Sequence, residues 1–271
     1  MSLSKYWPLV NFFSTSTTNP HSFALIILNR PISPNCLVFK NLFKQANIRV
    51  CADGGANELY QTFVVDLKNK ALENNESESF IPDYICGDLD SLLPEVEEYY
   101  KNKQVPIRHV QDQDSTDLTK SLQLIEELET SKNSVEKKLD IVVYGGIGGR
   151  FDHSLATIQF LYHIHDRLAL VYSPKNITIL LESGLKHTIH LPSQSQGNSC
   201  GLLPIGGPVT QCSTSGFRWN LTKQALEFGG LVSSSNIADN QTLVVDLTES
   251  NTNLPKKYPL VFNIEIKDDK H

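Results

Sequence analysis

The sequence predicts an α/β N-terminal domain with a mostly parallel sheet, followed by an all-β sandwich as the C-terminal domain. Before about residue 175, short apolar runs rich in Val and Ile alternate with stretches of helical periodicity, which favours parallel strands covered by helices. After that point, short strand-like runs are separated by Gly, Pro, Asn and Ser, which is typical of a β-sandwich. We expect an N-terminal extension over 1–20, the α/β domain over 21–175 and the sandwich over 176–271.

Strands and helices alternate along the N-terminal domain. Its strand-like apolar runs are 23–28, 48–53, 84–88, 107–110, 140–146 and 168–173. Helical patterns are present at 56–65, 116–128 and 151–164. In the second of these helices, one apolar stripe is formed by Leu118, Leu122, Ile125 and Leu128. Two polar segments, 68–79 and 129–138, are expected to be surface loops or solvated helix ends.

The C-terminal domain shows almost no helical periodicity. Its short runs, such as "ITILLES", "KHTIHL", "TLVVDL" and "LVFNIEI", have the length of strands. Only residues 221–228 keep a pattern that a helix could have.

Composition excludes several classes of protein. The chain has 271 residues, a formal net charge of -6 and a hydrophobic fraction of 40%, so we expect a globular protein and no nucleic-acid partner. The longest apolar run, 23–28, is too short to cross a membrane, and the first twenty residues do not resemble a signal peptide. The five cysteines lack the spacing of a zinc motif and suit reduced thiols, so we expect a cytoplasmic protein.

Two carboxylates stand at the end of an apolar strand. Asp88 and Asp90 are two positions apart, and on extended backbone that spacing places both side chains on the same side. The carboxyl ends of parallel strands are where open α/β sheets bind ligands. Carboxylates there suit Mg²⁺, which proteins hold with one or two carboxylates plus substrate phosphates. The alternative is that "GDLDS" is simply an acidic turn.

A second acidic segment, "DQDSTD" at 112–117, follows another apolar run. One interpretation is structural: Asp114 caps the helix that follows, and Asp117 imitates the second member of a capping box. Capping explains one acid or two, but it does not explain why a second acidic cluster also falls at a strand end. The two clusters together favour a metal–phosphate site.

Two glycine-containing segments also join a strand to a helix. Asp53 stands at the end of a strand and precedes two glycines, which either allow close approach to a ligand or make a tight turn. The segment "YGGIGGRFDH", 144–153, fits neither a dinucleotide fingerprint nor a P-loop. Its glycine amides and Arg150 could hold phosphate, while Asp152 could instead cap the next helix.

Trp219 in the C-terminal domain has two interpretations. Beside Arg218 and Asn220 it could stack on a flat, cationic ring, although a single Trp in a β domain is more often part of the core.

The ordered set "ADGGAN", "GDLDS", "DQDSTDLTK", "GGIGGRFDH", "GFRWNLT" and "LVSSSN" resembles the signature blocks of the thiamine pyrophosphokinase family. The resemblance covers about residues 23–265; the first twenty residues have no clear counterpart, and 68–79 looks like an insertion. It implies an α/β domain followed by a β-sandwich, and a homodimer with active sites between subunits. It also implies Mg²⁺-dependent transfer of pyrophosphate from ATP to thiamine, giving thiamine diphosphate and AMP.

The resemblance also implies roles for individual residues. Asp88, Asp90 and Asp117 would gather Mg²⁺ around the triphosphate, with Asp53 nearby. Phosphates would be held by Arg150 and the loop glycines, which are Gly145, Gly146, Gly148 and Gly149. Asp152 would help to order either that loop or the substrate. The expected thiamine-binding residues are Gln113, Ser215, Trp219, Asn220 and Ser234.

Two other functions compete with this one. A Mg²⁺-dependent phosphohydrolase would release inorganic phosphate or pyrophosphate, but its D-x-D-G-T motif is not met because Ser91 and Leu92 follow Asp90. A non-catalytic nucleotide or thiamine sensor would have no need to keep the full set of acids.

Overall fold

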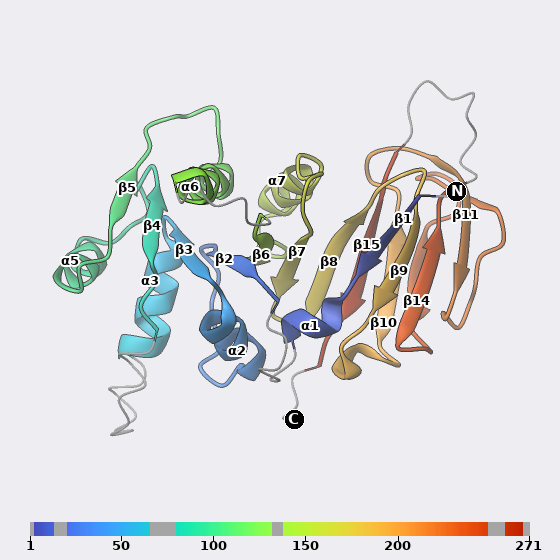
Figure 1. The fold of residues 1–271 in the computed structure, drawn as a ribbon, viewed down its shortest axis with the longest axis horizontal. Helices are drawn as coiled ribbons and strands as arrows, with labels where there is room; N and C mark the ends of the chain where they lie inside the picture. Colours follow the sequence, from blue (N-terminus) through green and yellow to red (C-terminus); the bar gives the residue numbers. More distant parts are fainter. Residues whose placement is uncertain (1–2, 14–20, 66–79, 132–137, 249–257, 268–271) are drawn as a thin grey trace. The chain divides into compact units, whose positions relative to one another are not determined.

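The computed structural model describes residues 3–13, 21–65, 80–131, 138–248 and 258–267 (Figure 1). The chain divides into two compact units. Ser22–Pro174 form an α/β unit, and Met1–His21 together with Lys175–His271 form a β unit. The division after Pro174 lies one residue before the end that the sequence predicted for the α/β domain.

The α/β unit is built on a parallel sheet with the strand order β7-β6-β2-β3-β4-β5. The strands are β2 (Phe23–Ile27), β3 (Ile48–Ala52), β4 (Tyr84–Gly87), β5 (Ile107–His109), β6 (Asp140–Tyr144) and β7 (Ala169–Ser173). Every residue of β2, β6 and β7 is buried, as expected for strands covered on both faces. The predicted parallel α/β architecture is confirmed.

Helices cover both faces of this sheet. The helices are α2 (Leu37–Gln45), α3 (Gly55–Tyr60), α5 (Pro94–Asn102), α6 (Asp117–Ser131) and α7 (Phe151–Leu161), and α3 continues into a π-helical turn, η1 (Gln61–Val65). The chain runs from β2 to β5 in one direction and then returns to β6 beside β2. Because crossovers are right-handed, this reversal puts α2 and α3 on one face and α6 and α7 on the other, as Figure 1 shows.

The three helical patterns recognised in the sequence correspond to α3, α6 and α7, whereas α2 and α5 were not recognised. The α5 signal was present in the sequence, since Pro94 occupies the first helical position and Glu95 lies in the first turn. The polar segment 68–79 lies outside the described residues; α6 extends into the other one as far as Ser131. Within the described ranges, no helix has the length and apolar character needed to cross a membrane.

The β unit contains two sheets, with strand orders β1-β9-β14-β11-β12 and β13-β10-β15-β8. Its strands are β1 (Ser4–Trp7), β8 (Asn176–Leu181), β9 (Lys186–His190), β10 (Ser199–Leu203), β11 (Val209–Ser215), β12 (Gln224–Leu226), β13 (Ser233–Ile237), β14 (Thr242–Asp246) and β15 (Leu260–Glu265). Two short helical segments accompany them, α1 (Leu9–Phe13) and η3 (Ser193–Ser195). Alternate residues of β9 and β14 are buried, and the Phe217 ring meets Phe262 edge-on at 6.3 Å.

Residues 221–228 do not form a helix. They contain β12, which pairs with β11 so that Leu226 lies opposite Val209. The helix-like spacing was misleading because Leu226 is the only buried residue of that strand.

The N-terminal segment belongs to the β unit, which corrects the expectation of an extension over 1–20. β1 pairs in parallel with β9, and the buried Trp7 Nε1–H donates to His187 Nδ1 at 3.1 Å. Since the indole can only donate, Nδ1 accepts and the His187 Nε2–H donates to the Glu182 carbonyl oxygen at 2.8 Å. Burial lowers the pKa of His187, in keeping with this neutral imidazole.

Trp7→Phe tests how far this contact holds the N-terminal strand. The change keeps an aromatic ring but leaves the buried His187 Nδ1 without its donor, so we expect a loss of about 1–2 kcal/mol in the free energy of unfolding. Urea unfolding followed by circular dichroism measures it. Tyr6→Phe is the control, because Tyr6 is 55% exposed on the same strand. Equal stability of both variants would contradict the expectation.

Candidate active site

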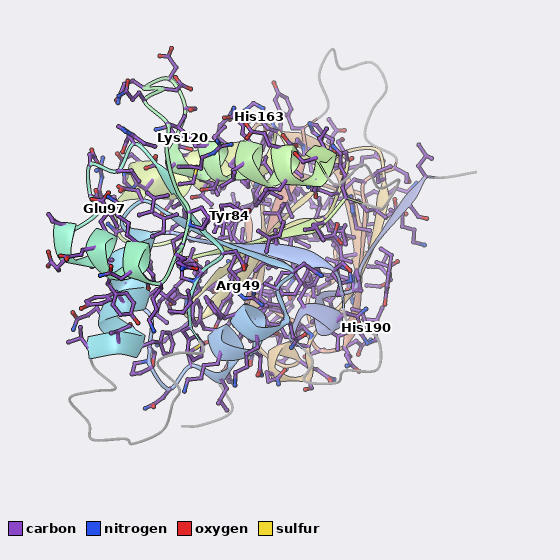
Figure 2. The ribbon with its side chains drawn as sticks, turned by 60° about the vertical axis from the view of Figure 1, so that its left-hand side comes forward. Arg49, Tyr84, Glu97, Lys120, His163 and His190 are labelled. Atoms are coloured by element: carbon purple, nitrogen blue, oxygen red, sulfur yellow. The ribbon has the colours of Figure 1, made fainter. Side chains whose placement is uncertain are left out.

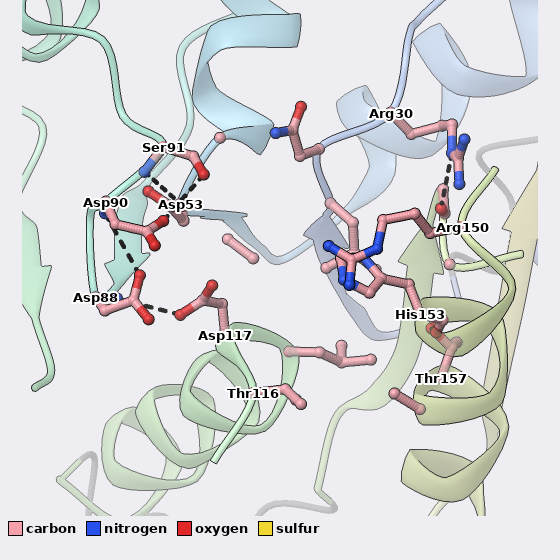
Figure 3. A pocket seen from close by; sticks show the side chains of 18 residues that line it. Arg30, Asp53, Asp88, Asp90, Ser91, Thr116, Asp117, Arg150, His153 and Thr157 are labelled. Carbon is pink, nitrogen blue, oxygen red and sulfur yellow. Dashed lines mark hydrogen bonds between the residues drawn. The ribbon is translucent and has the colours of Figure 1, made fainter. Parts of the chain in front are cut away.

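One pocket of about 420 Å³ lies at the carboxyl edge of the parallel sheet (Figure 3). It is lined by residues that follow β2, β3, β4 and β6 and by the first turns of α6 and α7. The strand order reverses between β2 and β6, and the carboxyl ends at such a reversal are where open α/β sheets bind ligands. The pocket is therefore placed by the topology of the sheet.

Three carboxylates meet on one side of this pocket. Oxygen atoms of Asp53, Asp88 and Asp117 lie within 4.8 Å of one another. Gly87 makes this approach possible, since a Cβ there would stand 2.9 Å from Asp117 Oδ1 and 3.0 Å from the Asp53 Cβ. The end of β4 thus needs a residue without a side chain.

A buried lysine that the sequence reasoning missed joins two of these acids. Lys120 lies on α6 (Figure 2). Its Nζ donates to Asp117 Oδ1 at 3.1 Å and to Asp88 Oδ2 at 3.3 Å, and its side chain is only 1% exposed. Asp117 Oδ1 also accepts the Asp88 N–H at 3.1 Å. Burial tends to raise the pKa of Asp88, but the Asp90 amide and the Lys120 ammonium hold it below its usual value. The available signal was the three-residue spacing from Asp117 to Lys120 on a helix.

Asp53 is the most deeply buried of the three acids. Its backbone is left-handed, with φ of 44°, and its Oδ2 accepts the Ser91 N–H at 3.1 Å. Burial raises the pKa of Asp53, and the charge of Asp117 adds to this effect. Its Oδ1 is buried without a hydrogen-bond partner. A buried carboxylate oxygen with no donor beside two further acids fits a site for a hard divalent cation.

Asp90 lies apart from this closest group. The sequence argument assumed extended backbone from 88 to 90, but Leu89 is left-handed, with φ of 64°, so the chain turns between the two acids. Asp90 still lines the pocket, and its Oδ1 accepts the Ser91 hydroxyl at 3.0 Å. The structure therefore groups Asp53, in place of Asp90, most closely with Asp88 and Asp117.

The other acids of 112–117 have structural partners. Asp112 accepts the Asp114 N–H at 2.9 Å and the Ser115 hydroxyl at 2.6 Å, which closes a turn. The cap of α6 is Thr116, whose Oγ1 accepts the Thr119 N–H at 3.2 Å, so the interpretation of Asp114 as the cap is wrong. Because Thr116 provides the cap, Asp117 is available for the acidic group. Gln113 is exposed in the same turn.

Two arginines and a histidine line the opposite side of the pocket. Figure 3 shows Arg30, Arg150 and His153 across from the acids. Arg30, which the sequence reasoning missed, donates to the carbonyl oxygens of Gly145 and Gly148. A Cβ at Gly145 or Gly149 would collide with Arg30. Glycine at these two positions therefore lets the Arg30 side chain pack against the loop. The only sequence signal was its position just after the first strand of the α/β domain.

Arg150 and Asp152 form a bidentate pair at the start of α7, with contacts of 2.6 and 3.2 Å. The hydrogen bonds from Arg150 lower the pKa of Asp152. No side chain caps the first turn of α7, so Asp152 is an ion-pair partner and not the cap. The Gly148 N–H donates to Ser154 Oγ at 3.0 Å, and the Ile147 N–H donates to Ser173 Oγ at 3.1 Å. These two amides are thus already engaged within the loop.

Trp219 lies on the surface of the β unit. It is 58% exposed, which excludes the core interpretation. Asn236 fixes its backbone, since Oδ1 accepts the Trp219 N–H at 3.2 Å and Nδ2 donates to the Trp219 carbonyl oxygen at 2.9 Å. Asn220 uses its Oδ1 to accept the Phe217 N–H at 3.2 Å. The serines expected beside Trp219 are Ser215, at the end of β11, and Ser234, in β13.

Comparisons with known proteins give consistent matches to both parts of the chain. Residues 39–172 match the family model described as thiamin pyrophosphokinase, catalytic domain. Residues 186–251 match the model described as thiamin pyrophosphokinase, vitamin B1 binding domain.

Individual proteins match over most of their length. Thiamine pyrophosphokinase 1 from Oryza sativa subsp. japonica is 35% identical over 238 residues, covering 84% of this chain and 88% of that protein. Thiamine pyrophosphokinase from Saccharomyces cerevisiae is 30% identical, covering 91% and 86%. The solved structure of thiamin pyrophosphokinase from Candida albicans superimposes with a TM-score of 0.76 at 27% identity, covering 98% and 94%.

Asp117→Asn tests the acidic group as a cation site. The change removes one negative charge while keeping the shape of the side chain, so we expect Mg²⁺ binding to weaken about tenfold or more. Isothermal titration with Mg²⁺ in the absence of nucleotide measures it. Asp114→Asn removes the same charge from an exposed position three residues away and is expected to leave the affinity unchanged. Equal loss in both variants would point to a general charge effect and contradict a specific site.

Proposed function

The chain belongs to the thiamine pyrophosphokinase family, and from this premise we propose that it transfers the pyrophosphate group of ATP to the hydroxyl of thiamine. The products are thiamine diphosphate and AMP. The observation that carries the proposal is the polarity of one pocket in the α/β unit, with Asp53, Asp88 and Asp117 facing Arg30 and Arg150. Such a pocket suits a polyphosphate that arrives with a divalent cation.

Mg²⁺ fits the acidic side of this pocket, because the residues offer clustered carboxylate oxygens, one of them buried without a partner. We propose Asp88, Asp90 and Asp117 as its ligands, together with Asp53. Bound Mg²⁺ would neutralise charge on the phosphate oxygens.

On the opposite side, Arg150 and the loop of Gly145, Gly146, Gly148 and Gly149 would surround the phosphates. Because the Gly145 and Gly148 amides already donate to Tyr172 and Ser154, we propose the Gly146 and Gly149 amides as the phosphate donors. Arg30 supports this loop through the carbonyl oxygens of Gly145 and Gly148. Asp152 orients Arg150 through two hydrogen bonds. A guanidinium held in this way meets a phosphate with little further loss of side-chain freedom.

The reaction is an in-line displacement at the β-phosphorus. The thiamine oxygen forms the new O–P bond, the bond between the β-phosphorus and its bridging oxygen to the α-phosphate breaks, and AMP leaves. The thiamine hydroxyl loses its proton. What the protein contributes is chiefly position and electrostatic stabilisation, as in phosphoryl transfer generally.

Thiamine recognition is assigned to Trp219, with Ser215, Asn220 and Ser234 beside it and Gln113 on the aminopyrimidine. The exposed indole of Trp219, on a backbone segment held by Asn236, supports this assignment, because an aromatic face attracts a flat cationic ring.

A product assay tests the function directly. The purified chain is incubated with ATP and Mg²⁺, with and without thiamine, and AMP, ADP and thiamine diphosphate are quantified. We expect thiamine-dependent AMP in equal amount to thiamine diphosphate. Inorganic phosphate or ADP as product would favour a phosphohydrolase or another kinase chemistry. Thiamine binding without nucleotide consumption would favour a sensor.

We further propose a homodimer in which each active site takes residues from both subunits. Asp117→Asn and Trp219→Ala are each expected to be inactive. If they are unfolded together and refolded as a mixture, half of the dimers carry one variant of each kind and one intact site. About a quarter of wild-type activity should return. Activity that stays at the level of the separate variants would show that each subunit builds its own site.

The proposed cytoplasmic location is supported by the cysteines. All five are buried thiols, and burial raises the pKa of Cys86 to about 11 and those of Cys200 and Cys212 to about 12. Thiols of this kind are typical of proteins in a reducing compartment.

A further inference from the structure

Lys120 is a charged residue beside the pocket, and the proposed reaction gives it no role. It lies on α6, one turn after Asp117, and its side chain is almost completely buried. Burying a lysine side chain is unfavourable unless the ammonium is paired. Its two partners are Asp88 and Asp117, two of the three acids that meet in the pocket.

The contacts of Lys120 leave room for a second cation. Its ammonium takes one oxygen from each partner, Oδ2 of Asp88 and Oδ1 of Asp117. The buried Oδ1 of Asp53 has no hydrogen-bond partner and is not reached by this lysine. The lysine therefore neutralises part of the acidic group and leaves Oδ1 of Asp88 and Oδ2 of Asp117 outside its own hydrogen bonds.

Lys120 changes the net charge of the acidic group. Three carboxylates and one ammonium leave the closest group with about two negative charges, and three without the lysine. A more negative group would bind a divalent cation more tightly by itself. It would also repel the phosphates of a nucleotide more strongly.

We propose that Lys120 is a resident counter-ion that holds Asp88 and Asp117 together in the metal-free protein and moderates the affinity of the acidic group for Mg²⁺. Mg²⁺ then binds measurably but weakly by itself, and more tightly together with substrate phosphates. Lys120 is a positioning residue and does not contact substrate. The inference rests on the proposed function, because it assumes that a metal–polyphosphate occupies this pocket.

Lys120→Met provides the test, measured without nucleotide. In EDTA the variant should unfold at least about 4 °C lower than the wild type, because Asp88 and Asp117 lose their counter-ion. Isothermal titration should show Mg²⁺ bound about tenfold more tightly, a change of about 1.4 kcal/mol. Saturating Mg²⁺ should restore most of the lost melting temperature. A lysine that only fills space predicts the opposite, namely unchanged or weaker Mg²⁺ binding.

Two further variants keep the outcome interpretable. Lys120→Gln retains donors for the carboxylates without the charge and should also bind Mg²⁺ more tightly, which separates charge from hydrogen bonding. Lys101→Met removes the same charge from an exposed pair with Glu97 and should change neither measurement. If neither Lys120 variant folds even in Mg²⁺, the proposal is overturned, because the metal should replace the missing cation.

The wild-type product assay remains separate from this test. If it yields no thiamine diphosphate, the proposed function fails, whereas the Mg²⁺ titrations still decide the role of Lys120. If the Lys120 variants bind Mg²⁺ as the wild type does while the product assay succeeds, only the present inference fails.

Discussion

Mutual repulsion among Asp53, Asp88 and Asp117 is the constraint that the α/β unit must satisfy. With their oxygens within 4.8 Å, each ionised pair repels by about 3–4 kcal/mol at an effective dielectric constant near 20. The fold offsets this in three ways: Gly87 gives the side chains space, the Asp88 amide donates to Asp117, and Lys120 supplies a buried positive charge. Repulsion of this size destabilises the folded protein. The acidic group is therefore better explained by the proposed cation than by a contribution to folding stability.

Sheet topology brings together residues that are far apart in the chain. The carboxyl ends of β3 and β4 carry Asp53 and Asp88, while the returning strand β6 carries the glycine loop beside Arg30. Because the strand order reverses between β2 and β6, opposite charges line the two sides of one pocket. A polyphosphate with its cation matches this distribution, whereas a neutral ligand would leave both sides uncompensated.

The parts predictable from sequence were those that depend on local pattern. The parallel strands followed from apolar runs, and Asp53 and Asp88 from their positions at strand ends. Contacts between distant segments were not accessible, so Arg30 was missed. Lys120 was missed although its spacing from Asp117 is local, because its pairing with Asp88 joins distant segments. Local geometry misled where one residue departed from the regular backbone, as Leu89 does between Asp88 and Asp90. The N-terminal strand was missed because it is short and only Trp7 of its residues is buried.

Trp219 is a large apolar side chain that stays exposed in the β unit. A tryptophan that contributed to the core would lose most of its exposed surface, yet this side chain is 58% exposed. Asn236 makes two hydrogen bonds with the backbone of Trp219. The Arg218 guanidinium lies 5.8 Å from the centre of the Trp219 ring and also pairs with Asp239. Holding a large apolar ring in water gains no stability from burial. The exposed ring is consistent with the proposed thiamine site, because a flat cationic ring has the complementary shape and charge.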